Sequence, residues 1–230
     1  MITPDDLDTA VTCVVDALRP TVDQDWSALA GSLDWTCRAT AEHLGQAHLH
    51  WASQLAVAAP TQYVRWSATA QELAPPAGVL DFVEAAGRIL ALVVRATPPE
   101  TRAYHPWGIG DPEGFTAMAC VESLLHGHDL TTTLGAALTP PADLTSTLAN
   151  PLDPPADLCA RILARAFPHE PRPTDDPWLN LRWLTGRTQI PGTPNPATWR
   201  WRPTPLDEPW DRAPTPAPMP FTPLSVGKDT

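Results

Sequence analysis

Apolar residues recur at helical spacing in four long segments of the chain, and polar residues separate the segments. A period of three to four residues is typical of a helix that buries one face. A proline or a capping side chain stands at the start of each segment, and a glycine follows the last one. The pattern therefore predicts four helices, over about residues 5–18, 36–58, 77–96 and 112–135.

The connections between these helices differ in length and composition. Asp34 or Thr36 could cap the second helix, because both side chains suit the N-cap position. Pro60 and Pro75-Pro76 bracket a long connection to the third helix, with a helical turn expected at about residues 63–73. A connection of this length allows a topology other than up-down-up-down, and no segment alternates as a strand would over this region. We expect an all-α fold.

Beyond the fourth helix the chain becomes rich in proline. Two short helices are predicted at about residues 155–167 and 176–184, the second ending at Gly186. From residue 191 onward the proline density predicts an extended arm. Within this arm, residues 198–202 alternate tryptophan with arginine, which predicts a short strand with one aromatic and one basic face. The expected organisation is a helical bundle over residues 1–137, a linker with short helices packed on it over 138–190, and the arm over 191–230.

Composition narrows the class of protein. Hydrophobic residues make up 43% and charged residues 18%, which is typical of a globular protein. No apolar run is long enough to span a membrane, and the N-terminal residues are acidic where a signal peptide would be basic, so we expect a cytoplasmic protein. The four cysteines form no CxxC pair, which argues against a disulfide framework and against a zinc site made of cysteines.

The net charge of −11 and the absence of a basic cluster argue against a nucleic-acid partner. We therefore expect small-molecule ligands, and a monomer or homodimer.

Candidate chemistry is concentrated in the predicted fourth helix. Glu122 and His126 are four residues apart, so both side chains leave the same face of that helix. A carboxylate and an imidazole so placed can share one metal ion, and a histidine from a neighbouring helix would complete a set of three protein ligands. The second helix offers His43, His48 and His50, and spacing alone does not choose among them.

Three stretches resemble one known family. They are Trp35-Thr-Cys-Arg-Ala-Thr-Ala-Glu-His43-Leu, Val121-Glu122-Ser-Leu-Leu-His126-Gly-His128-Asp129-Leu and Trp178-Leu-Asn-Leu-Arg-Trp-Leu-Thr-Gly186-Arg187. In this order they resemble the DinB-like superfamily, and specifically its branch of mycothiol-dependent maleylpyruvate isomerase N-terminal domains. The resemblance implies a DinB-like four-helix bundle with a long crossover connection.

The resemblance also implies a chemistry. It assigns His43, Glu122 and His126 as ligands of a divalent metal, with zinc expected and nickel or iron as alternatives. Asp129 would orient a ligand histidine. The cosubstrate would be mycothiol or a similar thiol, which zinc would convert to a nucleophilic thiolate. Addition to a double bond would then give isomerisation, and displacement of a leaving group would give an S-conjugate.

Further residues are candidates for substrate recognition. The irregular loop before the fourth helix and the arginines of the arm could lie above a metal. We take His128, His105 and Arg202 as catalytic candidates, and Tyr104, Trp107 and Arg200 as cosubstrate-binding candidates.

The tail departs from the family pattern, so maleylpyruvate itself is not the expected substrate. Two alternatives stay open. One is a metal-dependent hydrolase or Lewis-acid enzyme of specialised metabolism, and the other is a non-catalytic, metal-stabilised binding protein.

Overall fold

The computed structural model describes residues 1–135 and 152–210. This part of the chain contains six α-helices and no β-strand, which confirms the all-α prediction for these residues. Residues 136–151, which include the start of the predicted linker, and residues 211–230 at the end of the predicted arm lie outside the described residues. The helices are α1 (Pro4–Leu18), followed by the 3-10 turn η1 (Arg19–Thr21), α2 (Cys37–Val57), α3 (Pro76–Ala96), α4 (Pro112–Leu134), α5 (Ala156–Ala166) and α6 (Pro177–Leu184).

Side-chain caps set the starts of the helices that carry the candidate ligands. Thr36 caps α2, because its hydroxyl accepts a hydrogen bond from the Ala39 amide at 3.1 Å. Asp111 caps α4 and accepts from the Gly114 amide at 2.8 Å. Of the two predicted caps for α2, the structure therefore uses Thr36.

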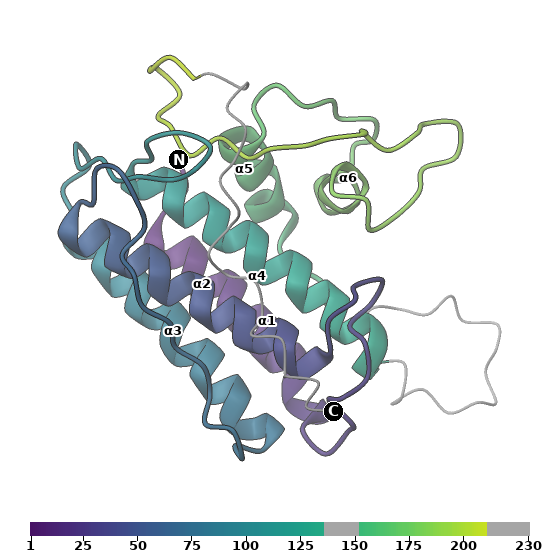
Figure 1. Ribbon diagram of the computed structural model, residues 1–230. Helices are drawn as coiled ribbons and strands as arrows, with labels where there is room; N and C mark the ends of the chain where they lie inside the picture. Colours follow the sequence, from purple (N-terminus) through teal and green to yellow (C-terminus); the bar gives the residue numbers. More distant parts are fainter. Residues whose placement is uncertain (136–151, 211–230) are drawn as a thin grey trace, which may run out of the picture.

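Helices α1 to α4 lie side by side, and α2 and α3 run in the same direction (Figure 1). Arg38, at the start of α2, donates to the carbonyls of Gln71 and Ala74, just before α3 begins. Near the other end of α2, the Gln54 side chain accepts from the Val64 amide at 2.7 Å. The connection between α2 and α3 therefore returns along the length of α2, which makes it a crossover, as its length had suggested.

The predicted helical turn over residues 63–73 is wrong. That segment contains no helix and lies along the bundle as an extended chain. Between Arg38 and Gln54, α2 rises about 24 Å at 1.5 Å per residue. Gln54 holds the Val64 amide and Arg38 holds the Gln71 carbonyl, so the segment from Val64 to Gln71 must cover most of that distance. Extended backbone at about 3.3 Å per residue does so, whereas a helix at about 1.5 Å per residue would cover less than half of it.

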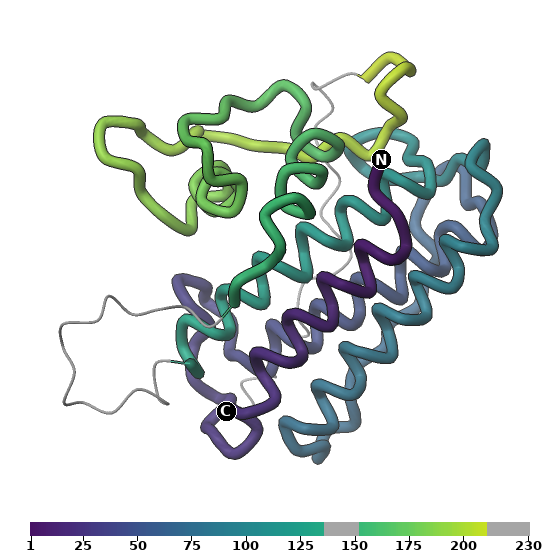
Figure 2. Tube along the Cα trace, turned by 180° about the vertical axis from the view of Figure 1, so that it is seen from behind, coloured from purple at the N-terminus to yellow at the C-terminus, as the bar shows by residue number. Residues whose placement is uncertain are grey.

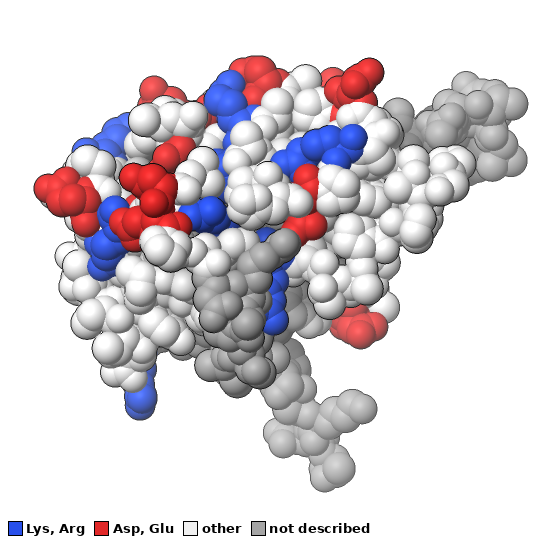
Figure 3. Space-filling model, turned by 90° about the horizontal axis from the view of Figure 1, so that it is seen from above, with Lys and Arg blue, Asp and Glu red and all other residues white. Residues whose placement is uncertain are grey.

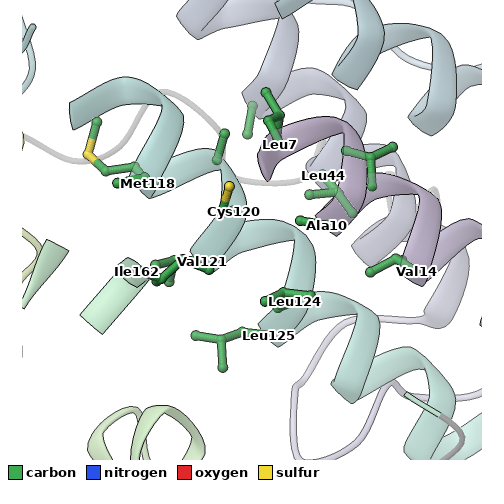
Figure 4. Packing of buried hydrophobic residues seen from close by; sticks show 14 of the residues in the cluster. Leu7, Ala10, Val14, Leu44, Met118, Cys120, Val121, Leu124, Leu125 and Ile162 are labelled. Atoms are coloured by element: carbon green, nitrogen blue, oxygen red, sulfur yellow. The ribbon is translucent and has the colours of Figure 1, made fainter. Parts of the chain in front are cut away.

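Helix α4 lies at the centre of the molecule. Nearly all its residues are buried, around its whole circumference, because α1 and α2 cover one side and α5 covers another. Figure 4 shows its apolar side chains between Leu7, Ala10 and Val14 of α1 and Ile162 of α5. A helix that is apolar on all sides is typical of a core position. Any polar side chain on α4 therefore needs a specific partner.

Helices α5 and α6 pack on each other, and the tube in Figure 2 shows them on one side of α4. The arm passes over α5, where Trp199 and Trp201 contact each other and Trp107.

The predicted strand over residues 198–202 is wrong, because its neighbours are a helix and a loop. To the other described residues, the backbone of residues 198–202 makes one backbone–backbone hydrogen bond, from the Arg202 amide to the Ala166 carbonyl at the end of α5. Helices offer no row of free backbone groups that could form a ladder.

Acidic and basic side chains are interspersed on the face seen in Figure 3. Within residues 1–135 and 152–210, no helix combines the length and apolar character needed to cross a membrane.

Candidate metal centre

Packing of α2 against α4 brings His43, Glu122 and His126 together. Glu122 Oε2 lies 3.0 Å from His126 Nε2 and 3.4 Å from His43 Nε2. The three potential ligand atoms all lie within 4.8 Å of one another. One face of α4 thus supplies the pair that is four residues apart, and α2 supplies the histidine that completes the set.

The geometry fits a divalent metal ion. Tetrahedral zinc with ligands at its usual bond lengths holds neighbouring ligand atoms about 3.4 Å apart. Glu122 Oε2 is buried and accepts no hydrogen bond from the described residues, although two imidazole nitrogens are close to it. A buried carboxylate oxygen without a hydrogen bond is costly, and a shared cation would satisfy it. Two imidazoles and one carboxylate are ligands that zinc accepts.

Asp129 lies behind the candidate ligand His126. Its Oδ2 is 3.3 Å from His126 Nδ1, on the ring edge opposite to Nε2. Arg187, which follows α6, contacts the same carboxylate through two nitrogens, at 2.9 Å and 3.2 Å. The contact expected between Asp129 and a ligand histidine is therefore present, and Arg187 is an additional partner that the sequence analysis did not identify.

The carboxylates set the protonation of the site. Burial by itself would lower the pKa of His126, but the charges of Glu122 and Asp129 outweigh it and raise that pKa to about 9. Burial would raise the pKa of Glu122, and the two facing histidines instead hold it far below its usual range. A proton on His126 therefore competes with a metal ion for the same nitrogen.

The other two histidines of α2 point elsewhere. His48 is fully buried, and its Nε2 lies 3.1 Å from the hydroxyl of Ser123 on α4. His50 stacks on Trp66 with ring centroids 4.8 Å apart. Burial lowers the pKa of each of these histidines to about 4, so both are neutral near pH 7. The structure brings only His43 of the three to Glu122.

His128 does not join the cluster. It leaves α4 on another side from His126 and meets the Trp178 ring of α6 edge-on, at 5.7 Å between centroids. Burial and the charge of Arg182 lower its pKa to about 4. Its position is that of a packing residue between α4 and α6.

The loop before α4 forms an aromatic cluster. His105 is 1% exposed, and its Nδ1 accepts a hydrogen bond from the Trp107 amide at 3.1 Å. Tyr104 is half-buried and meets the Tyr63 ring. Burial lowers the pKa of His105 to about 3, although the charge of Glu122 acts in the opposite direction. The charge of Glu122 therefore reaches this loop, but the structure places His105 inside the aromatic cluster.

The two arm arginines have structural partners. Arg202 is buried, and its guanidinium donates to the carbonyls of Thr204, Pro205 and Glu208. Its Nε and Nη2 groups are thereby occupied, and the predicted basic face of the arm does not form. Arg200 lies over the Trp107 ring, with its guanidinium carbon 6.0 Å from the ring centroid.

Two residues at the centre were not predicted as site residues. Trp35 lies 4.9 Å from His43 and 6.3 Å from His126 between ring centroids, so its indole covers both imidazoles. Its position in the sequence could have predicted this contact. Trp35 directly precedes the Thr36 cap of α2, and His43 lies in the first turns of the same helix. Arg187 is 58 residues from its partner Asp129, and no local spacing could have paired them.

No family model, curated protein or solved structure matches this chain.

Proposed function

We propose that this protein is a metal-dependent enzyme, with zinc as the expected ion, that activates a low-molecular-weight thiol such as mycothiol for reaction with a small electrophile. The observation that carries the proposal is the convergence of His43, Glu122 and His126. The resemblance of the surrounding stretches to the mycothiol-dependent branch of the DinB-like superfamily supports the choice of a thiol.

Each residue of the site would have a distinct role in binding the metal. His43 and His126 would present neutral Nε2 atoms, and Glu122 would supply one negative charge. The Asp129 carboxylate, 3.3 Å from His126 Nδ1, favours the tautomer with its proton on Nδ1, which leaves Nε2 free. When bound, zinc has a fourth position at which it can lower the pKa of a thiol and make the thiolate available near pH 7. Trp35 shields one side of the two imidazoles from water.

Metal content tests the first half of the proposal. Protein purified without chelator, and protein reloaded with Zn²⁺, are analysed by mass spectrometry together with His43→Ala, Glu122→Ala and His126→Ala. We expect about one zinc per chain in the wild type and a loss of more than about 100-fold in affinity in each variant. The matched control is His128→Ala, on the same helix but directed toward Trp178, which should keep its zinc. A wild type that cannot be loaded would refute the metal centre.

The dependence of turnover on a thiol tests the proposed reaction. The zinc-loaded protein is incubated with mycothiol and a panel of electrophiles, and products are identified by mass spectrometry. An S-conjugate supports transfer, and a rearranged substrate with the thiol recovered supports isomerisation. Turnover without any thiol would instead favour a hydrolase. A zinc-loaded protein without turnover on any of these substrates would favour a binding protein.

A further inference from the structure

The buried carboxylate of Asp129 joins a candidate metal ligand to a residue outside the four-helix bundle. Its side chain is 2% exposed, and that of Arg187 is 15% exposed. One oxygen, Oδ2, faces both His126 Nδ1 at 3.3 Å and Arg187 Nη2 at 2.9 Å. The other oxygen, Oδ1, accepts from Arg187 Nε at 3.2 Å. A ligand, a carboxylate and a guanidinium therefore form one chain of contacts.

Arg187 contacts Asp129 at two points, and the second contact fixes the orientation of the carboxylate. A guanidinium that binds both oxygens sets the plane of the carboxylate, because its donors are held in a rigid fork. The plane of Asp129 in turn decides where Oδ2 lies relative to His126 Nδ1. Without Arg187 the carboxylate could rotate, and His126 would lose the partner that orients its ring.

The backbone at the end of α6 directs Arg187 toward Asp129. Gly186 has a φ of +79°, and its amide donates to the Trp183 carbonyl at 3.1 Å. The Arg187 amide donates to the Arg182 carbonyl at 2.8 Å. These two bonds form a Schellman motif, which reverses the chain in a left-handed conformation that favours glycine. Arg187 is thus the first residue after a rigid turn.

We propose that Arg187 is a positioning residue for the metal ligand His126, acting through Asp129, so that metal affinity depends on the segment containing α6. This inference rests on the proposed metal centre. It makes the C-terminal segment a part of the site, although all three ligands belong to α2 and α4.

The test measures Zn²⁺ affinity of the full-length protein by competition with a chromophoric chelator. Arg187→Ala should bind zinc about 10-fold to 100-fold more weakly, the range found when a partner of a ligand is lost. Arg187→Lys should recover part of the loss, because an ammonium can hold one oxygen but has no fork. Gly186→Ala should also weaken binding, since it strains the turn without removing a charge.

The matched control is Arg161→Ala. Arg161 of α5 pairs with Asp6 of α1 and therefore also ties the C-terminal segment to the bundle. If Arg187 acted only through general stability, the two alanine variants would affect zinc binding alike. We expect wild-type affinity in Arg161→Ala.

A double-mutant cycle with Asp129→Asn separates positioning from stability. The effect of Arg187→Ala on zinc affinity should largely disappear in the Asp129→Asn background, because the carboxylate that Arg187 orients is already gone. Additive losses would overturn the proposal, as would wild-type affinity in a folded Arg187→Ala. Should Arg187→Ala fail to fold, Arg187→Lys and Gly186→Ala decide by the same criteria. A wild type that binds no zinc overturns the metal centre itself, which is a different result from wild-type affinity in the variants.

Discussion

His126 and His105 are both buried histidines, yet their surroundings are opposite in character. His126 faces two carboxylates, Glu122 at 3.0 Å and Asp129 at 3.3 Å. His105 is enclosed by four aromatic rings whose centroids lie 5.8 Å to 6.3 Å from its own. These rings belong to Tyr63, Trp107, Phe115 and Trp201. Burial lowers the pKa of His105 to about 3, whereas the carboxylates overcome burial at His126 and raise its pKa to about 9.

The difference shows what distinguishes a ligand-type histidine from a packing one in this molecule. Both rings are removed from water, so burial cannot be the distinguishing property. Facing carboxylates make the His126 site attractive to a cation, whether that cation is a proton or a metal ion. His105 is surrounded by neutral aromatic rings, and burial outweighs the charge of Glu122, so it stays uncharged near pH 7.

The largest effect is expected from removing the charge that faces His126. Glu122→Gln removes one of the two carboxylates that balance the charge of the buried, protonated His126. The metal-free protein should therefore lose about 3 kcal/mol of unfolding free energy at pH 7. Urea denaturation in EDTA measures this loss. In parallel, the pKa of His126 should fall well below 9 in an NMR titration. An unchanged His126 titration would contradict the electrostatic account, and Glu84→Gln on α3 is the control.

A loss of about 2 to 3 kcal/mol is expected for His105→Ala. The substitution leaves a cavity in the aromatic cluster and deprives the Trp107 amide of its acceptor. His105→Phe should cost less, because the ring volume is retained. Zinc affinity should stay within about twofold of the wild type in both variants, since the ring is outside the ligand set. A tenfold drop in affinity would show that the loop belongs to the metal centre.

The two regions should also give opposite pH dependence in the metal-free protein. Unfolded His105 takes up a proton near pH 6.5 and the folded form does not until about pH 3, so stability should fall as pH drops from 6.5 toward 3. Folded His126 keeps its proton up to about pH 9, so its contribution is complete below pH 6.5 and is lost as pH rises toward 9. Each slope can reach about 1.4 kcal/mol per pH unit.

Urea denaturation across this pH range tests the assignment. His105→Phe should reduce the slope of the acid limb, to which the lowered pKa values of His48, His50 and His128 also contribute, and should leave the alkaline limb unchanged. His126→Gln should reduce the slope of the alkaline limb. If both variants alter the same limb, the assignment of the two histidines is wrong.

The smallest effect is expected at Trp35, which contacts the rings of His43 and His126 without offering a metal-binding atom of its own. Trp35→Leu should weaken zinc binding by less than about tenfold, because one aromatic contact is worth about 1 kcal/mol. It should also remove most of the change in tryptophan fluorescence on adding Zn²⁺. Trp178→Leu, which alters a tryptophan of α6, should leave that change in place. Loss of the signal in Trp178→Leu alone would contradict the placement of Trp35.

Local pattern was sufficient for much of the fold. The six described helices fall close to the predicted ranges, because apolar spacing, caps and prolines act within a few residues. Two predictions of local structure were wrong for a non-local reason. Residues 63–73 had to span the length of α2, and residues 198–202 met a helix and a loop where a strand would need another strand.

The sequence by itself determined that Glu122 and His126 share a face of α4, because the helical period is a property of the local backbone. It left open which histidine of α2 would meet them, and only the family resemblance pointed to His43. Tertiary structure decided that choice and the contact between Asp129 and Arg187. Both depend on how whole helices are rotated against each other. That rotation follows from the packing of side chains far apart in the chain, which no local spacing contains.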